Sequence, residues 1–246
     1  MRTHDIDSLE RATLAAVPPQ QLQELDGWLL PLDDGTVGRA HSAVPLRHED
    51  VRGDLLEAIQ ARYSERRLAA AFRLPQEPAF DALKDELDAR RYSPSQPTLT
   101  MVAAVEDVAS LAAPGAVELA NAPHESWSSV FLGEGFDPVD GASRVAILRR
   151  AHRSLFAAAR FDGRVVAVGS ACYAHDWCGI HGMRTLPAWR GRGLASSILA
   201  ALAREAQRRG ITRAFLQVEQ ANAPAQSLYR RAGFGPAWTY EYWRRA

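Results

Sequence analysis

The segment 182–197 constrains the fold of this chain most, because a strand pattern, a glycine-rich loop and an amphipathic helix pattern follow one another there without a break. Its loop is Arg190-Gly191-Arg192-Gly193. Glycines let a backbone approach a ligand closely, N–H groups at a helix start attract anions, and guanidinium forks fit phosphate oxygens. The segment therefore predicts a diphosphate-binding loop. A surface turn with two solvated arginines would have the same sequence, because short glycine-rich motifs are weakly specific.

Two common phosphate-binding motifs are excluded. No Gly-Lys-Ser/Thr follows the loop, so it is not a Walker loop, and the third glycine of a dinucleotide-binding Gly-x-Gly-x-x-Gly is missing. The helix pattern after the loop gathers its apolar residues on one face, which predicts packing against a sheet. Those residues are Leu194, Ile198, Leu199, Leu202 and Ala206.

A second motif follows downstream, where the strand pattern Phe215–Glu219 leads into a helix pattern. Residues Asn222–Phe234 have the form Asn-x-x-Ala-x-x-x-Tyr-x-x-x-Gly-Phe. Together with Arg190-x-x-Gly193-x-Ala195, this segment resembles the two signatures of the GNAT superfamily of N-acetyltransferases, in their usual order and at their usual separation. The resemblance covers the C-terminal half of the chain.

The resemblance implies a mixed α/β fold, with a twisted mixed sheet flanked by helices and acetyl-CoA as the acyl donor. It also implies a cleft between two neighbouring parallel strands that separate around the pantetheine arm. By position, the residues that would bind CoA are Met183, Arg184, Thr185, Arg190, Gly191, Arg192, Gly193, Leu194, Ala195, Ser196, Asn222 and Tyr229.

Tyr229 is the first catalytic candidate, because the resemblance implies that it lies beside the sulfur of the thioester. Attack of an amine on a thioester releases a thiolate. A phenol, whose pKa is near 10, can donate a hydrogen bond or a proton to that sulfur. The alternative is a core tyrosine with a satisfied hydroxyl.

The general base is the second catalytic candidate, since an acceptor amine must be neutral to attack. Glu219 ends a strand that would face the cleft, and we take it as the leading candidate. An exposed carboxylate paired with an arginine is the structural alternative. His181, His175 and Asp176 lie on or before the neighbouring strand and are further candidates, since an unperturbed imidazole titrates near 6.5.

The two cysteines predict neither a metal site nor a disulfide framework. Cys172 and Cys178 lack zinc-site spacing, and no second Cys/His pair completes such a site. They also lack a His–Asp setting for an acyl-cysteine intermediate. We therefore expect buried small residues or free thiols, and no bound metal.

The N-terminal half echoes the C-terminal half. The segments 41–46 and 71–72 have counterparts at 181–187 and 214–215, and 89–92 has a counterpart at 231–234. This pattern predicts two tandem GNAT-like units, a degenerate one at 1–110 and a catalytic one at 111–246.

The element pattern of the N-terminal half predicts a helix at 8–17 and strands at 28–30 and 36–44 joined by a turn at Asp33-Asp34-Gly35. The loop of the first copy carries Glu49, Asp50 and Asp54 where a diphosphate would lie. Acidic side chains favour a helix start and repel an anion there. We therefore expect one CoA per chain, in the C-terminal half.

The composition of the chain indicates which classes of partner to expect. The chain has 29 Lys and Arg residues and 29 Asp and Glu residues, so its formal net charge is zero. This charge balance does not indicate a nucleic-acid partner. The first ten residues carry four charges and no apolar run, and no stretch is long and apolar enough to cross a membrane. We expect a cytoplasmic protein without a membrane partner, and a homodimer stays open.

The sequence thus predicts an acetyl-CoA-dependent N-acetyltransferase that moves an acyl group to a primary amine of a small molecule or peptide by direct transfer. The alternative is a non-catalytic acyl-CoA-sensing or scaffold protein that keeps the cofactor site. Tyr229 favours the enzyme, and the lack of an obvious base keeps the alternative open.

Overall fold

A computed structural model describes residues 3–49, 55–112, 115–133 and 135–245. Asp50 and Asp54, expected near the first-copy loop, lie outside these residues. The helices are α1 Thr3–Ala16, α2 Leu56–Ser64, α3 Asp81–Ala89, α4 Val105–Ala109, α5 Glu125–Ser128, α6 Pro138–Arg149, α7 Leu194–Arg208 and α8 Ala223–Arg231, with 3-10 turns η1 Gly38–Ala40, η3 Pro78–Phe80 and η4 Pro187–Trp189.

The strands form one large mixed sheet and one small antiparallel sheet. The large sheet has eight strands in the order β4-β11-β5-β10-β9-β8-β7-β6, and the small sheet has the order β1-β2-β3. The strands are β1 Gln21–Leu25, β2 Trp28–Leu32, β3 Val44–Pro45, β4 Phe72–Pro75, β5 Tyr92–Ala104, β6 Val117–Ala120, β7 Ser154–Phe161, β8 Arg164–Ala174, β9 Trp177–Thr185, β10 Arg213–Glu219 and β11 Gly235–Arg245. The predicted mixed α/β architecture is confirmed.

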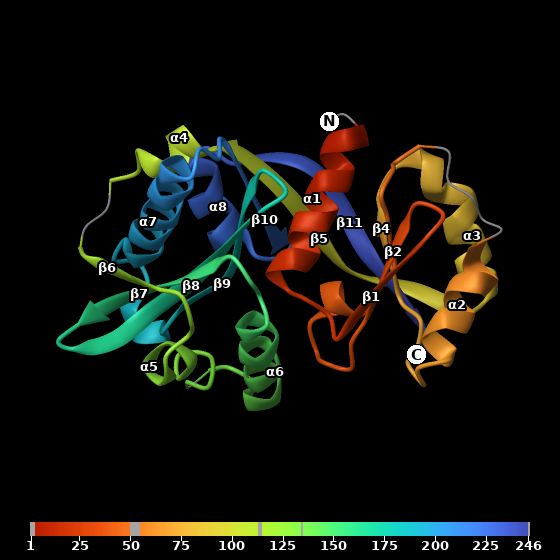
Figure 1. The fold of residues 1–246 in the computed structure, drawn as a ribbon, viewed down its shortest axis with the longest axis horizontal. Helices are drawn as coiled ribbons and strands as arrows, with labels where there is room; N and C mark the ends of the chain where they lie inside the picture. Colours follow the sequence, from red (N-terminus) through yellow and green to blue (C-terminus); the bar gives the residue numbers. More distant parts are fainter. Residues whose placement is uncertain (1–2, 50–54, 113–114, 134, 246) are drawn as a thin grey trace.

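Helices cover both faces of the large sheet (Figure 1). Side chains alternate between the faces of a strand, and in β10 Leu216 packs in the core cluster of α4, α7 and α8, whereas Phe215 packs in the cluster of α1. A third cluster joins η1 and α6 through Val37 and Val145. We call the side of the sheet that bears α1, η1 and α6 the α1 face, and the opposite side the α7 face.

The last strand of each half of the chain lies between strands of the other half. β5 pairs with β10 on one side and with β11 on the other, and β11 also pairs with β4. The two halves therefore share one continuous sheet. An isolated parallel bridge between Ala43 and Phe72 links the small sheet to β4.

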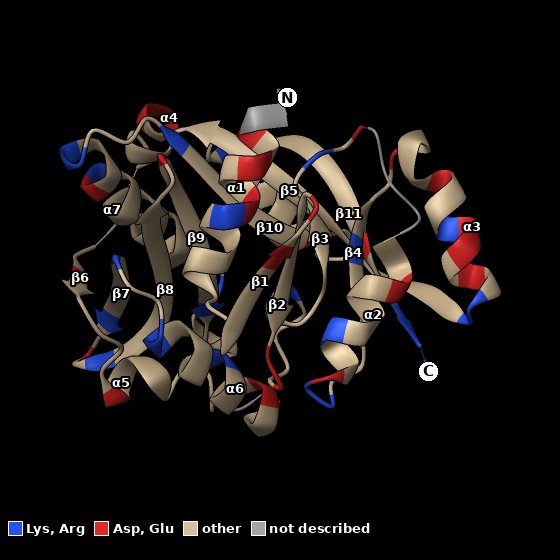
Figure 2. Cartoon of the chain, turned by 45° about the vertical axis from the view of Figure 1, so that its right-hand side comes forward, with Lys and Arg blue, Asp and Glu red and all other residues tan. Residues whose placement is uncertain are grey.

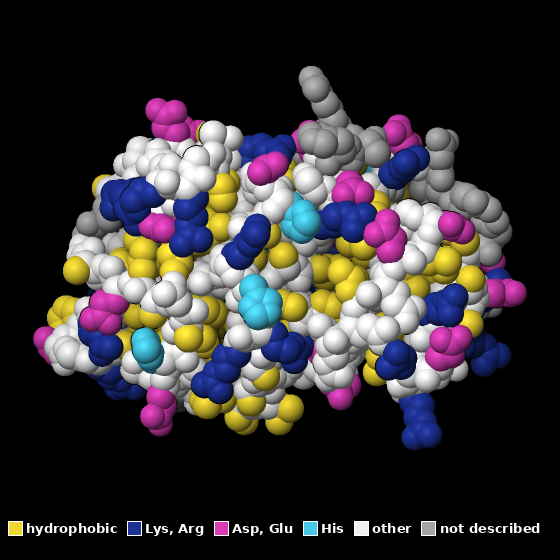
Figure 3. Space-filling view, viewed as in Figure 1, with side chains coloured by type: hydrophobic (Ala, Val, Ile, Leu, Met, Phe, Trp, Pro, Cys, Tyr) yellow, Lys and Arg dark blue, Asp and Glu magenta, His cyan; other side chains and the backbone are white. Residues whose placement is uncertain are grey.

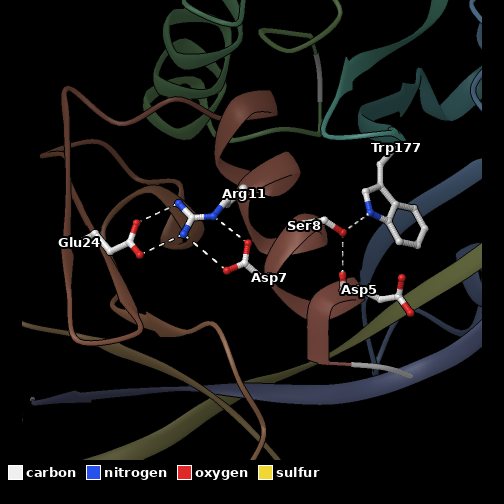
Figure 4. A network of polar contacts seen from close by, with 6 residues as sticks. All are labelled: Asp5, Asp7, Ser8, Arg11, Glu24 and Trp177. Atoms are coloured by element: carbon white, nitrogen blue, oxygen red, sulfur yellow. Dashed lines mark hydrogen bonds and ion pairs between the residues drawn. The ribbon is translucent and has the colours of Figure 1, made fainter.

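Helix α1 links the small sheet to the large one through side-chain hydrogen bonds (Figure 4). The Arg11 guanidinium donates to Asp7 in its own helix and to Glu24 in β1, at 2.7 and 2.9 Å. The Trp177 indole N–H in β9 donates to Ser8 at 2.9 Å. Acidic and basic residues are interspersed along α1, α2 and α3 (Figure 2).

The expected hairpin at Asp33-Asp34-Gly35 is wrong. β2 pairs instead with β1, through a turn at Asp26-Gly27, whose φ angles of 43° and 84° are those a tight hairpin requires. The Asp33 carboxylate is held elsewhere, because it accepts from the Gln20 and Gly35 N–H groups. The segment 36–44 contains η1, and the expected strand is reduced to its last residue, Val44, which begins β3 and pairs with Leu29 of β2.

In the C-terminal half the predicted elements agree closely with the structure. Asp162-Gly163, a dipeptide typical of tight hairpins, joins β7 to β8 with both φ angles positive, and the helix pattern that follows Phe215–Glu219 is α8. The helix pattern that begins at Leu194 is α7. Among the described residues, no helix is long and apolar enough to cross a membrane.

Candidate active site

The parallel strands β9 and β10 separate part of the way along their length. They pair from Trp177 with Arg213 to Ile180 with Leu216, and no pair follows. β9 then bulges against β8, where Gly169 faces both Gly182 and Met183. Gly182 has a φ of +62°, a conformation that favours glycine. The separation opens the sheet and exposes backbone groups on its two rims.

A cleft of about 970 Å³ occupies this opening. It is lined by the residues that the resemblance implied for CoA binding and by both leading catalytic candidates: Met183, Arg184, Thr185, Arg190, Gly191, Arg192, Gly193, Leu194, Ala195, Ser196, Glu219, Asn222 and Tyr229. The strands β9 and β10, the loop before α7 and the helices α7 and α8 thus meet in one place.

The loop before α7 presents unsatisfied donors. Gly191 and Gly193 both have a φ of +76°, and Gly193 begins α7 without a side-chain cap. The Arg190 guanidinium bonds only weakly, to the Thr185 carbonyl at 3.4 Å, and the Arg192 guanidinium lies over Trp189 at 4.7 Å. Within the described part of the chain, neither arginine pairs with a carboxylate. The loop can therefore hold an anion at the helix start.

Asn222 begins α8 and lies at the rim of the same cleft. Its side-chain oxygen accepts the Ala225 N–H at 3.2 Å, which caps the helix. This bond fixes the side chain and leaves its amide nitrogen as a donor toward the cleft.

Tyr229 in α8 is buried, with 8 % of its surface exposed, and packs edge-on against Phe234. Its hydroxyl makes no hydrogen bond to any residue that the structure describes. Burial raises the pKa of Tyr229 to about 12. The phenol is therefore neutral near pH 7, and it is a better hydrogen-bond donor than proton donor.

The base candidates lie in different surroundings. Glu219 is exposed at the rim of the cleft, where it accepts from Gln96 at 3.4 Å. His181 is buried beside Phe215 on the α1 face, and neither of its ring nitrogens has a hydrogen-bond partner among the described residues. Burial and the positive charge of Arg39 lower the pKa of His181 well below 6.5, so it is neutral.

His175 and Asp176 are not part of the site. They form the turn between β8 and β9, at the end of β9 that lies away from the separation. They do not line the cleft. Sequence proximity to the strand was misleading, because a strand of this length carries its two ends far apart.

A second wall of the cleft, which local sequence patterns do not indicate, comes from the N-terminal half and the last strand. Its residues include Arg39, Gln96, Thr98, Tyr240 and Tyr242. None has a local motif. They reach the cleft because η1 lies on the α1 face and β5 is inserted beside β10.

Comparisons with known proteins agree with this geometry. The family described as "Probable histone acetyltransferase Rv0428c C-terminal" matches residues 3–243. No curated protein matches the chain in sequence.

Several solved structures share the fold. A GCN5-related N-acetyltransferase from Kribbella flavida superposes with a TM-score of 0.70 at 19% identity, over 98% of this chain and 95% of that one. A tandem GNAT protein from the clavulanic acid biosynthesis pathway gives 0.61 at 14% identity, over 97% and 86%. A GCN5-related N-acetyltransferase from Sphaerobacter thermophilus gives 0.60 at 15% identity, over 100% and 93%.

Proposed function

Since the chain belongs to the Rv0428c C-terminal acetyltransferase family of the GNAT superfamily, we propose that it is an acetyl-CoA-dependent N-acetyltransferase acting on a primary amine of a small molecule or peptide. The observation that carries the proposal is the opening between β9 and β10, flanked by a helix start without a side-chain cap and by a Tyr229 hydroxyl that has no hydrogen-bond partner in the described part of the chain.

The residues of the α7 face fit the cofactor. We assign the diphosphate to the Arg190–Gly193 loop and to the N–H groups of Leu194, Ala195 and Ser196. The backbone of Met183, Arg184 and Thr185 and the Asn222 amide would hold the pantetheine arm. When bound, acetyl-CoA supplies a thioester whose acetyl carbon accepts a nucleophile.

The proposed reaction is direct transfer. The amine nitrogen forms the amide bond as the carbon–sulfur bond breaks, and the sulfur leaves as a thiolate. Tyr229 donates a hydrogen bond to that sulfur, a role that suits a neutral phenol in an apolar setting. Glu219 accepts the proton lost by the amine and passes it to solvent, because it is exposed at the rim.

We also propose the two-unit division at 1–110 and 111–246. The elements α1-β1-β2-β3-α2-β4-α3-β5 recur in the same order as α6-β7-β8-β9-α7-β10-α8-β11. The Ala43–Phe72 bridge repeats the parallel pairing of β9 with β10. We expect only the second unit to bind CoA. A cytoplasmic location and a homodimer stay predictions from the sequence.

The test is acetyl-CoA turnover by the intact chain with a pooled amine library, followed by the appearance of free thiol. Thiol release that depends on added amine supports the enzyme. Tight binding of acetyl-CoA without any turnover would instead support an acyl-CoA-sensing protein.

A further inference from the structure

Arg39 occupies a fixed place on the α1 face of the cleft. It lies in η1, whose Gly38 packs so closely that a Cβ there would meet the Tyr242 ring at 2.9 Å. The Arg39 Nη1 atom donates to the side-chain oxygen of Gln217 at 2.7 Å. This bond joins the N-terminal half to β10, and Arg39 lines the cleft on the α1 face, which we call the acceptor side of the opening.

The positive charge of Arg39 has no carboxylate partner among the residues that the structure describes. Within the described ranges its one hydrogen-bond partner is the neutral amide of Gln217. Its charge acts instead on two neutral groups. It lowers the pKa of His181, and it opposes the rise in the pKa of Tyr240 that burial causes. Nε and Nη2 stay available, and these two atoms form the fork that binds a carboxylate with two parallel hydrogen bonds.

Two further arginines, Arg144 and Arg184, add positive charge to this wall of the cleft. Arg144 and Arg184 both pair with one carboxylate, Asp140, at 2.6 and 3.6 Å. Arg184 also lies over the ring of Phe136 at 4.2 Å. Figure 3, which views the molecule as in Figure 1, shows Lys and Arg side chains on the outer surface beside α6.

The net charge of the side chains on the acceptor side favours substrates of a particular charge. Arg39, Arg144 and Arg184 line this side together with Glu219. Asp140 adds a second carboxylate as the partner of Arg144 and Arg184, so three guanidiniums and two carboxylates leave one positive charge. A neutral amine that carries one carboxylate balances it. A phosphomonoester brings nearly two negative charges, and a lysine-rich peptide adds further positive charge to a basic wall.

We infer that the acceptor is a small amino-carboxylate, whose carboxylate is bound by the Arg39 fork while its amine lies at the opening between β9 and β10. This inference rests on the proposed function and names its substrate class. Gln217 orients Arg39, and Gln96 and Thr98 line the same wall as neutral polar contacts. The specificity-determining residue therefore comes from the N-terminal half.

The experiment compares matched amines with the intact chain and acetyl-CoA, followed by thiol release. L-Phenylalanine is paired with phenethylamine and β-alanine with ethylamine, and an oligolysine peptide blocked at both ends forms a third arm. At least one carboxylate-bearing amine should have a kcat/KM about tenfold to a hundredfold above its partner and above the peptide, the usual effect of a hydrogen bond to a charged group.

Three variants locate the effect. Arg39→Gln should remove the preference, so that kcat/KM of each carboxylate-bearing amine falls to within about twofold of that of its partner measured with the same variant, because the contact to the carboxylate is lost. Gln217→Glu gives Arg39 an internal carboxylate and should have the same result, which covers the case in which Arg39→Gln does not fold. Arg66→Gln, an exposed arginine after α2 that does not line the cleft, is the control and should keep the preference.

The outcomes separate the two proposals when acetyl-CoA binding is measured by calorimetry on the same samples. Lack of binding overturns the proposed function and this inference with it. Binding with turnover of phenethylamine or the peptide at least as good as that of the amino-carboxylates overturns only the inference. A preference that persists in both Arg39→Gln and Gln217→Glu also overturns it, as does failure of every carboxylate-bearing amine to react.

Discussion

Ile180 in β9 and Leu216 in β10 are the last partnered residues of two parallel strands that separate immediately after them. The α7 face of this opening carries the glycine loop and Tyr229, and the α1 face carries Arg39 and Gln217. The function proposed for the chain depends on this separation, because it lets two substrates reach each other through the sheet.

Tyr229→Phe should lower kcat by about 10- to 100-fold with little change in the Kd for CoA. The reason is that a hydrogen bond to a charged group contributes about 1.5–3 kcal/mol, and here it forms only as the sulfur becomes negative. Stopped-flow thiol release and calorimetry on the same samples measure the two quantities. A loss of CoA affinity with unchanged kcat would make Tyr229 a packing residue.

Glu219→Gln should lower kcat/KM near pH 7, and the loss should become smaller as pH rises. At higher pH more of the acceptor amine is already neutral, so a base is needed less. The matched control is Glu118→Gln in β6, whose carboxylate is exposed and pairs with Arg160 away from the cleft. A loss of the same size at every pH would argue against Glu219 as the base.

His181 should make the protein less stable as the pH falls below about 6.5. Burial lowers its pKa in the folded state, so below pH 6.5 the unfolded chain binds a proton that the folded chain does not. Stability from this group is complete above 6.5 and falls by up to about 1.4 kcal/mol per pH unit below it.

His181→Phe tests this, because Phe can keep the edge-on contact with Phe215. Urea unfolding between pH 7.5 and 5 should show a shallower slope in the variant. His41 and His48 also have lowered pKa values through burial, so part of the slope should persist. An unchanged slope would contradict the assignment.

The buried ion pair between Glu10 in α1 and Arg73 in β4 should be costly to break. Each residue is 1 % exposed, and the guanidinium donates to both carboxylate oxygens, at 3.1 and 2.5 Å. Glu10→Gln leaves a buried guanidinium uncompensated, which should cost about 3–5 kcal/mol of unfolding free energy. Replacing both residues, as Glu10→Leu/Arg73→Met, should cost much less, and a double variant as unstable as the single one would contradict this account.

Local sequence predicted the cofactor side of the site well. Loop 190–193, α7, α8 and the Asp162-Gly163 hairpin depend on glycine conformation, helix periodicity and turn type, all of which short segments specify. Asp26-Gly27 offered the same turn signal as Asp162-Gly163 and was missed because Asp34-Gly35 repeats the dipeptide nearby.

The acceptor side could not be predicted from local patterns. It depends on β5 lying between β10 and β11, and strand order across a sheet is decided by packing between distant segments. Arg39 was expected in a strand, whereas it lies in η1 and meets Gln217, a residue 178 positions away. No pattern within the segment 36–44 indicates that contact.

The central claim is that this chain binds acetyl-CoA in the opening between β9 and β10, at one site per chain. Calorimetric titration of the intact protein tests it most directly, with Arg190→Ala/Arg192→Ala as the variant and Arg66→Ala as the exposed control. We predict a stoichiometry of one, an unchanged Kd for the control, and a loss of several kcal/mol of binding free energy in the double variant, from about 1.5–3 kcal/mol for each charged hydrogen bond. A stoichiometry of two, or equal affinity in the double variant and the parent, would contradict it.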